Sequence, residues 1–338
     1  MIVDLRSDTV TKPTKEMLEA MFSAQVGDDV FVEDPTINKL EEKSAQLFGF
    51  EAGLFCPSGT MTNQIAIKVH TNPPGEVICD FKYHIYQYEG GGIGFNSGLS
   101  ARLIYSESGL LTAKQVEECI NPDDVHKAET QLVSLEDTCN RGGGNYYDIQ
   151  EVKKIKSLCN QYNLPLHLDE AKDYNALVEK GIKPNELSNY YNSISVCLSK
   201  GLGCPVGSVL LGNKAFIKKA RRIRKIFGGG MRQAGFMAAA GIYALDNNIN
   251  RLKDDHKKAQ EIADTLKTLP FVKSIDTPPT NIVIYQLEGN VAKQQVEKLK
   301  EKGILAYPIT SDSVRMVTHL DITDEMVEYT CQQLANSL

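Results

Sequence analysis

Two hydrophobic periods alternate along this chain. Between short apolar runs, side chains recur at helical spacing, as Val152, Ile155 and Cys159 do. Strands that alternate with helices are typical of a mainly parallel sheet covered by helices, so an α/β fold is expected. The predicted strands at 194–199 and 207–212 are close enough in sequence to pair as a hairpin. The predicted strands are 53–56, 77–80, 131–136, 164–169, 194–199 and 207–212.

The pattern changes after residue 233. One long helical region is predicted from about Gln233 past Asp264, and its second half begins a smaller lobe. We therefore divide the chain into a large domain, residues 1–247, and a small C-terminal domain, residues 248–338. The elements predicted for the small domain are strands at 281–285 and 314–318 and helices around 291–302 and 324–337.

Composition narrows the class of protein. The net charge of −6 over 338 residues leaves no basic excess for binding nucleic acid. The eight cysteines show no C-x-x-C spacing, so we expect reduced thiols and no zinc or other metal site. The N-terminus lacks a signal-peptide pattern, and no run approaches the roughly 18 apolar residues that cross a bilayer. A soluble, cytoplasmic protein without membrane partners is expected.

Two strand ends carry the most specific chemistry. Lys200 closes one apolar run and opens the glycine-rich stretch 201–207, and Asp169 ends the preceding predicted strand. A lysine amine forms a Schiff base with an aldehyde, and a carboxylate can keep a pyridine nitrogen protonated. Most lysines are solvated and most strand-end aspartates are caps. Together, however, the two residues predict a pyridoxal phosphate site.

Other residues fit the same chemistry, and each also has an ordinary explanation. Gly59 and Thr60 stand at a predicted helix start, which favours a phosphate or is a plain cap. His84 precedes a glycine run and could stack on an aromatic ring, or be a hydrogen-bonded loop residue. Arg232 follows glycines and suits a phosphate clamp. Arg315 interrupts an apolar strand and needs an anion such as a substrate carboxylate, unless it faces water.

Over essentially its whole length the chain resembles the low-specificity L-threonine aldolases, in the β-eliminating group of fold-type-I pyridoxal phosphate enzymes. The motifs that carry the resemblance are Asp4-Leu-Arg-Ser-Asp-Thr-Val-Thr-Lys-Pro-Thr14, Gly27-Asp-Asp29, Glu33-Asp-Pro-Thr36, Pro57-Ser-Gly-Thr60, Tyr88-Glu-Gly90, Ser199-Lys-Gly-Leu-Gly203, Pro205-Val-Gly-Ser208, Gly228-Gly-Gly-Met-Arg-Gln233 and Val317-Thr-His319.

The resemblance implies a large, mainly parallel sheet domain with a smaller C-terminal α/β domain, and a homodimer or homotetramer. It implies cleavage of β-hydroxy-α-amino acids to glycine and an aldehyde, with pyridoxal 5'-phosphate as cofactor. By this resemblance, Lys200 would bond to the cofactor, Asp169 would pair with its ring nitrogen and His84 would stack on its ring. Gly59, Thr60 and Arg232 would bind its phosphate, and Ser7, Lys172 and Arg315 would hold the substrate carboxylate. His126 would lie near the substrate hydroxyl, and both His126 and part of the phosphate site would come from a neighbouring subunit.

Several motif positions depart from the family pattern. Lys172 replaces the usual arginine and can supply charge but no planar two-pronged grip. These departures suggest either a natural relative with shifted specificity or a remodelled, possibly engineered site. In a remodelled site the native activity and cofactor could be lost, with new polar groups placed around the cavity. Racemase-like or β-elimination chemistry on the same cofactor is a third reading. The altered positions are Val32, Phe81, Tyr83, Asp137, Glu170, Lys172 and Asp173.

Overall fold

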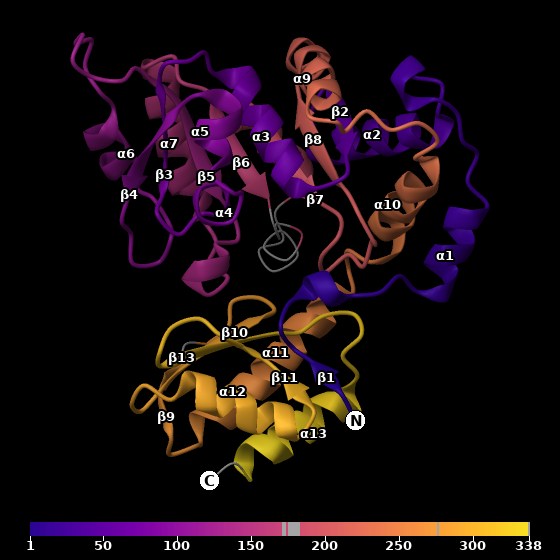
Figure 1. The fold of residues 1–338 in the computed structure, drawn as a ribbon, viewed down its shortest axis with the longest axis vertical. Helices are drawn as coiled ribbons and strands as arrows, with labels where there is room; N and C mark the ends of the chain where they lie inside the picture. Colours follow the sequence, from indigo (N-terminus) through magenta and orange to yellow (C-terminus); the bar gives the residue numbers. More distant parts are fainter. Residues whose placement is uncertain (171–173, 175–182, 276, 337–338) are drawn as a thin grey trace.

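The computed structural model describes residues 1–170, 174, 183–275 and 277–336, and it has two lobes (Figure 1). The large lobe is built on a seven-stranded sheet and the small lobe on a four-stranded sheet. This arrangement confirms the predicted mainly parallel sheet with a smaller C-terminal lobe. Among the described residues, no helix is both long and apolar enough to cross a membrane.

The strand order of the large sheet places the middle of the chain at its centre. One strand, β8, runs antiparallel to both of its neighbours, and the other strands are parallel to one another. The predicted hairpin of β7 and β8 is confirmed. In order across the sheet, the strands are β2 (Ala52–Cys56), β8 (Ser208–Gly212), β7 (Ser193–Cys197), β6 (Leu166–Glu170), β5 (Thr130–Glu136), β3 (Glu76–Asp80) and β4 (Ser100–Ile104).

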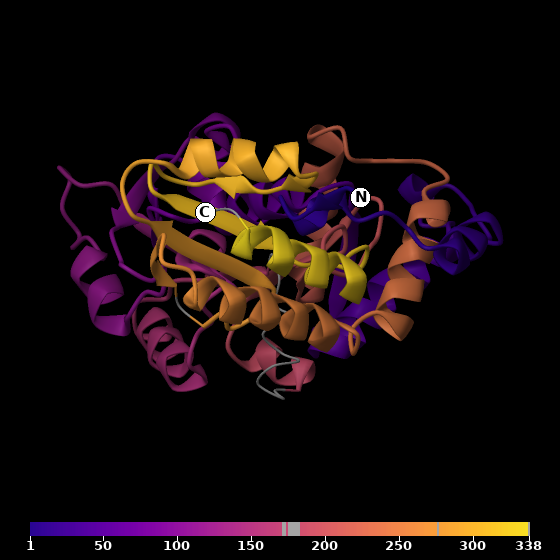
Figure 2. The same ribbon diagram turned by 90° about the horizontal axis from the view of Figure 1, so that it is seen from below.

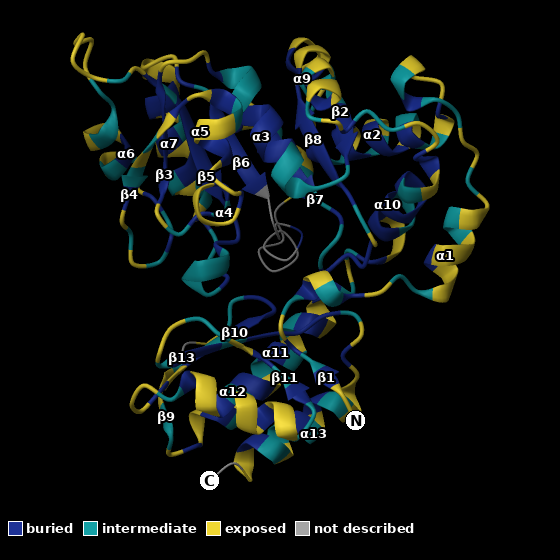
Figure 3. Cartoon of the chain, viewed as in Figure 1, coloured by how far each residue is buried: buried dark blue, intermediate teal, exposed yellow. Residues whose placement is uncertain are grey.

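Helices cover both faces of this sheet because successive strand residues point to opposite sides. In β2, Leu54 and Cys56 pack with helices α3 and α9, whereas Phe55 belongs to the other core cluster, with α2. Both faces are therefore apolar, and the strands are largely buried except for the edge strand β4 (Ser100–Ile104) (Figure 3). The helices of this lobe are α1 (Lys15–Phe22), α2 (Pro35–Phe48), α3 (Gly59–His70), α4 (His84–Gln87), α5 (Gly92–Ser97), α6 (Ala113–Cys119), α7 (Ile149–Gln161), α9 (Lys214–Ile226) and α10 (Gly235–Asn247).

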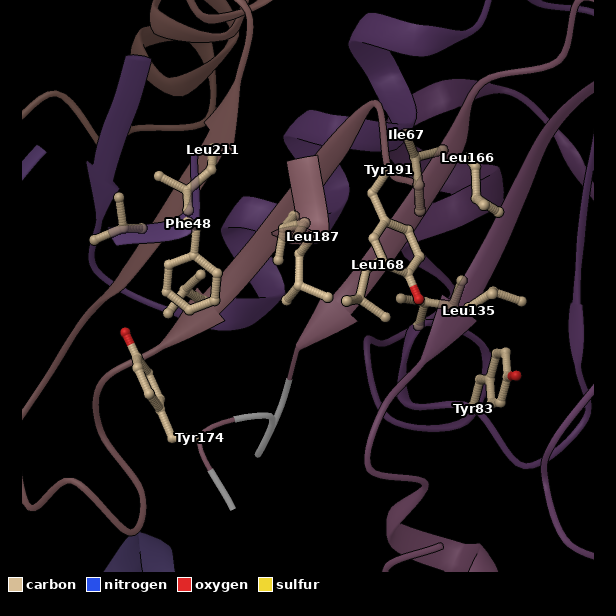
Figure 4. Close-up of a cluster of buried hydrophobic side chains, with 14 of the residues drawn as sticks. Phe48, Ile67, Tyr83, Leu135, Leu166, Leu168, Tyr174, Leu187, Tyr191 and Leu211 are labelled. Carbon is tan, nitrogen blue, oxygen red and sulfur yellow. The ribbon is translucent and has the colours of Figure 1, made fainter. Parts of the chain in front are cut away.

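The main core lies against the central strands. Leu135 of β5 and Leu168 of β6 lie there with Leu187 and Tyr191, which come from the segment before β7 (Figure 4). Tyr83 packs at the same core, beyond Leu135. These side chains are almost fully buried, and burying each large apolar side chain stabilises the fold by about 1.5–3 kcal/mol.

The basic cluster at 218–225 lies on α9. Two of its arginines turn inward: Arg224 is buried and pairs with Asp29, and Arg221 pairs with Glu41 at 2.6 Å. Arg224 also donates to the carbonyl of Phe55 in β2. These two arginines therefore fasten α9 to the edge of the sheet, and they are not available to bind a nucleic acid.

The helical region predicted from about Gln233 past Asp264 is present but is broken in the structure. The structure has two helices, α10 and α11 (Leu252–Lys267), separated by residues 248–251. Asn248 ends α10, and its side-chain amide donates to the carbonyl of Leu202 at 2.8 Å. Asparagine favours such local and tertiary bonds over continuing a helix, which explains the break.

The small lobe has its own core, which starts in the sequence with Val3 and Leu5 and continues from Ala259. β1 pairs in parallel with β11, so the first residues of the chain join this lobe. The split of the chain at residues 247 and 248 stays a prediction. Figure 2 shows α11 and α13 side by side over the small sheet. The remaining elements are β1 (Val3–Asp4), β9 (Val272–Ile275), β10 (Ile282–Leu287), α12 (Ala292–Glu301), β11 (Ile304–Leu305), β12 (Tyr307–Pro308), β13 (Ser313–Val317) and α13 (Asp324–Ala335).

Val32 adopts a backbone conformation that favours glycine. It follows the short 3-10 helix Asp29–Phe31 with φ 62° and ψ 29°, in the left-handed region. Its amide donates to the carbonyl of Asp29, and its carbonyl accepts from Asn38. A β-branched residue is strained there by about 1–3 kcal/mol. The glycine found at this position in the resembling family therefore has a structural reason.

We expect Val32→Gly to raise the free energy of unfolding by about 1 kcal/mol, because relief of strain exceeds the extra flexibility of the unfolded chain. The Val32 side chain is 51% exposed, so little hydrophobic burial is lost. Urea denaturation of the variant and the parent measures the difference. Val32→Ala keeps the β-carbon and should change little, and a Gly variant less stable than the parent would contradict the strain argument.

Candidate active site

A cavity of about 280 Å³ lies where the two lobes meet. Its walls come from the N-terminal segment, the start of α4, the loop after β5, the turn after β7, and the small-lobe strands β12 and β13. Four of the residues predicted for the site line it: Ser7, His84, Lys200 and Arg315. The lining residues are Ser7, Asp8, Thr9, His84, Tyr88, Asn140, Arg141, Lys200, Tyr307 and Arg315.

Parallel pairing gathers the acidic groups at this edge. Glu136 of β5 lies opposite Asp169 of β6, and Asp169 lies opposite Ser195 of β7. Strand β7 ends at Cys197, so Lys200 stands three residues beyond it in the turn rather than closing the strand. The carboxyl ends of parallel strands are the usual place for a ligand in an α/β sheet.

Lys200 is half-buried in this acidic surrounding. Burial lowers the pKa of its amine, while neighbouring groups, led by Cys197 and Asp8, raise it, and the net shift is upward. The amine is therefore held as an ammonium ion. It must lose its proton before it can bond to a carbonyl carbon.

Asp169 is a buried carboxylate that is only partly satisfied. It is 5% exposed, and its Oδ2 atom has no hydrogen-bond partner among the described residues. Burial raises the pKa of this carboxyl, against a lowering by His84. A buried carboxylate is stable as an anion only beside a cation or a proton donor, and a protonated pyridine nitrogen is such a donor. The site therefore fits the predicted cofactor.

His84 is the first residue of α4, and two carboxylates hold it. Its backbone N–H donates to Glu136, and its Nδ1 atom lies 2.9 Å from Oε1 of Glu89. Burial lowers the pKa of His84, but the bond to Glu89 and the charge of Asp169 outweigh it, so the net shift is upward. The imidazole is thus held in place, with its Nδ1 atom directed at Glu89.

His84, Glu89 and Asp169 place one nitrogen or oxygen each within 4.8 Å of one another. Both oxygens of Glu89 already accept hydrogen bonds, from Asn63 at 2.9 Å and from Gln64 at 2.6 Å. The arrangement is therefore a hydrogen-bonded network around the imidazole rather than a site shaped for a cation.

Arg315 brings a cation from the small lobe. Its guanidinium donates to the side chain of Asn140 at 2.8 Å and to the carbonyl of Arg6 at 3.0 Å. Its Nε atom has no partner within the described part of the chain. Burial lowers the pKa of this guanidinium, and Asp8 opposes the shift. An incompletely paired, half-buried arginine fits a carboxylate ligand.

The start of α3 has the predicted anion-binding form. Ser58 caps the helix by accepting from the amide of Met61, and Gly59 and Thr60 form the first turn. The N–H groups of a first turn and the helix dipole favour a negative group. A β-carbon at Gly59 would lie 3.4 Å from Oγ of Ser208, which is buried and lacks a partner among the described residues.

The structure does not bring Arg232 and His126 into the cavity of a single chain. Arg232 is more than half exposed and pairs with Asp28 at 2.7 Å. His126 is exposed in the loop before β5, where it contacts Asp124. Their predicted roles in the site stay predictions. Lys172, Asp173 and the side chain of Glu170 lie outside the described residues.

The altered side chains that the structure describes do not form a new polar lining of this cavity. Tyr83 is fully buried, and its hydroxyl lies 2.6 Å from that of Tyr147 in the core. Asp137 is buried and accepts from the backbone of Tyr147. Phe81 stacks on Tyr105 near the surface. None of Tyr83, Asp137 and Phe81 lines the 280 Å³ cavity.

Sequence reasoning missed several residues that line the cavity, among them Tyr88, Asn140, Arg141 and Tyr307. The guanidinium of Arg141 lies 5.2 Å from the ring of Tyr88, and that of Arg315 lies 5.8 Å from the ring of Tyr307. The loop at 140–144, with its arginine and three glycines, was a signal that could have found Arg141.

Known proteins are similar to this chain over nearly its whole length. The β-eliminating lyase family matches residues 4–290. The chain is 42% identical to the low specificity L-threonine aldolase of Escherichia coli K12, over 96% of both chains. It is 40% identical to a probable low-specificity L-threonine aldolase 2 of Arabidopsis thaliana, over 97% of this chain and 94% of the relative.

The fold is also similar to that of a solved structure, the threonine aldolase of Leishmania major. The TM-score is 0.85, with 19% identity, over 99% of both chains. This likeness supports the fold-type-I architecture. The family match covers most of the chain, and the Escherichia coli relative is 42% identical over 96% of both chains. The chain therefore belongs to the β-eliminating lyase family.

Proposed function

We propose that this protein is a pyridoxal phosphate-dependent aldolase that cleaves threonine-type β-hydroxy-α-amino acids to glycine and an aldehyde, which is acetaldehyde for threonine. The observation that carries this proposal is that Lys200 and the guanidinium of Arg315 line one cavity, with the carboxylate of Asp169 close enough to Lys200 to raise the pKa of its amine. The names of the full-length relatives give the same activity.

The residues of the site suit the cofactor. Lys200 would bond to its aldehyde carbon, Asp169 would accept from its ring nitrogen, and the first turn of α3 at Gly59 and Thr60 would bind its phosphate. When bound, pyridoxal phosphate draws electrons from the α-carbon of the amino acid and so stabilises the charge left after Cα–Cβ cleavage. The unpartnered Oδ2 of Asp169 supports this assignment.

The remaining groups would bind the amino acid and move protons. Arg315 and Ser7 would hold the substrate carboxylate, with Lys172 as a third candidate. The orientation of Arg315 is set by Asn140, which accepts from its Nη1. His84 would lie against the cofactor ring with Nδ1 committed to Glu89, which leaves Nε2 for the site. The proton of the substrate hydroxyl would pass to a base such as His126 of a neighbouring subunit.

We further propose a homodimer or homotetramer. Arg232 and His126 lie outside the cavity of their own chain, so their family roles require a neighbouring subunit. Large apolar side chains are exposed and could pack between subunits, among them Phe22 at 83% and Phe95 at 91%. These observations support an assembly without fixing the number of subunits.

The remodelled-site hypothesis has no support in the comparisons, which find full-length aldolase relatives at about 40% identity. Tyr83 and Asp137, two of its proposed new groups, do not line the cavity.

Lys200→Ala should abolish the visible absorption that pyridoxal phosphate gains when it bonds to the protein, because no amine remains at this position. Threonine cleavage, measured as acetaldehyde release, should fall to background. A spectrophotometric titration with the cofactor checks the first result. Lys172→Ala is the control and should keep the band. Loss of the band in that control, with an unchanged band in the Lys200 variant, would move the assignment to Lys172.

Arg315→Lys should raise the KM for threonine ten- to a hundredfold with a smaller effect on kcat, because a lost bidentate charged hydrogen bond costs about 1.5–3 kcal/mol. Arg141→Lys is the matched control, since Arg141 lines the same cavity but lies over Tyr88. Steady-state acetaldehyde release, at saturating cofactor, measures both. A larger effect of the Arg141 substitution would assign the carboxylate to that residue instead.

A further inference from the structure

A continuous line of polar side chains runs through the large lobe to the candidate site. Nε2 of His70 lies 2.7 Å from Oγ of Ser193, which lies 2.8 Å from Nδ1 of His167. Nε2 of His167 lies 3.2 Å from Oδ1 of Asn63, whose Nδ2 donates to Glu89 at 2.9 Å. Four hydrogen bonds in series therefore join the end of α3 to the carboxylate that holds His84.

The fold produces this line from regular elements. Asn63 and His70 are seven residues apart, two turns along the same face of α3. That face packs against β7, which carries Ser193, and His167 lies on the neighbouring strand β6. Ser193, His167 and Asn63 are at most 1% exposed, and His70 is half-buried. Water therefore has little access to the bonds, and the groups must satisfy one another.

The direction of the hydrogen bonds begins at Glu89. Its side chain accepts from the amides of Asn63 and Gln64 and faces Nδ1 of His84. An ionised carboxylate has no proton to donate and can accept from all three. The NH₂ group of Asn63 thus faces Glu89, and its carbonyl oxygen faces His167 and accepts from Nε2–H.

The rest follows from the charge state of the two buried histidines. Burial lowers the pKa of His167 to about 3 and that of His70 to about 4, so both are neutral. A neutral imidazole has one donor and one acceptor nitrogen. Nδ1 of His167 therefore accepts from the hydroxyl of Ser193, and the oxygen of Ser193 accepts from Nε2–H of His70. Every hydrogen points toward Glu89.

We propose that His70, Ser193, His167 and Asn63 are positioning residues, which form a one-directional hydrogen-bond relay that fixes Glu89 as an acceptor and thereby keeps a proton on Nδ1 of His84. The relay thus sets the protonation of Nδ1 in His84, while the contact of Nδ1 with Glu89 leaves Nε2 for the cavity. The use of that nitrogen rests on the proposed function, but the relay itself does not, so it is tested on the protein without substrate.

The first test is the tautomer of each histidine, read from ¹⁵N spectra of the full chain labelled at histidine, with assignments from single His→Gln variants. The relay predicts neutral, Nε2-protonated rings for His70 and His167 between about pH 5 and pH 8, and a proton on Nδ1 of His84. An Nδ1-protonated tautomer at His70 or His167 would overturn the relay, whether or not the protein cleaves threonine.

The second test cuts the relay in its middle. In Ser193→Ala we expect His167 to populate both neutral tautomers and the Nδ1–H resonance of His84 to shift. Ser195→Ala is the matched control: Ser195 is a buried serine of the same strand, and its hydroxyl lies 2.6 Å from that of Thr62. It should leave both signals unchanged. Equal spectra for the two variants would reject the coupling, and if Ser193→Ala does not fold, the parent tautomers decide.

Discussion

Glu136 and Asp169 lie opposite each other on neighbouring parallel strands, and both are buried. Burial raises the pKa of both carboxyls, and the charge of Asp169 raises that of Glu136 further. The two carboxylates differ in their hydrogen bonds. Glu136 accepts from the backbone amides of His84 and Asn140, whereas one oxygen of Asp169 is left open within the described residues. The proposed pairing of Asp169 with a protonated ligand rests on this open oxygen.

The other parts of the site depend on this pair of strand ends. Glu136 fixes the start of α4, and so the place of His84, through one oxygen, and the loop after β5 through the other. From that loop, Asn140 reaches Arg315 of the small lobe. Arg315 also donates to the carbonyl of Arg6, which ties in the N-terminal segment. A single buried carboxylate thus links the position of the imidazole to that of the guanidinium in the other lobe.

Strand-end chemistry could be predicted from the sequence, because parallel strands bring their carboxyl ends to one edge. Asp169 was predicted in this way, and so was Lys200, although Lys200 stands in the turn after its strand. Arg315 was found because a charge inside an apolar strand needs a partner. The loop residues Asn140 and Arg141 were not predicted; the arginine and glycines of the loop were a signal for Arg141, but tertiary packing sets where the side chains lie. The break after α10 depends on a contact between Asn248 and Leu202 that periodicity does not encode.

The family resemblance also suggested roles for Arg232 and His126. Both residues lie away from the cavity of their own chain, so these roles stay predictions that depend on the proposed assembly. Val32 differs from these residues because the effect of its departure from glycine is local. Its backbone has a positive φ, which the sequence pattern alone did not predict.

The central claim is that the open carboxylate and the lysine at this edge hold one cofactor. A crystal structure of the protein grown with pyridoxal phosphate tests it most directly. The account predicts electron density continuous from Nζ of Lys200 to the cofactor, with the ring nitrogen in hydrogen-bond contact with Oδ2 of Asp169. Cofactor bonded to a different lysine, or a ring nitrogen that faces away from Asp169, would contradict it.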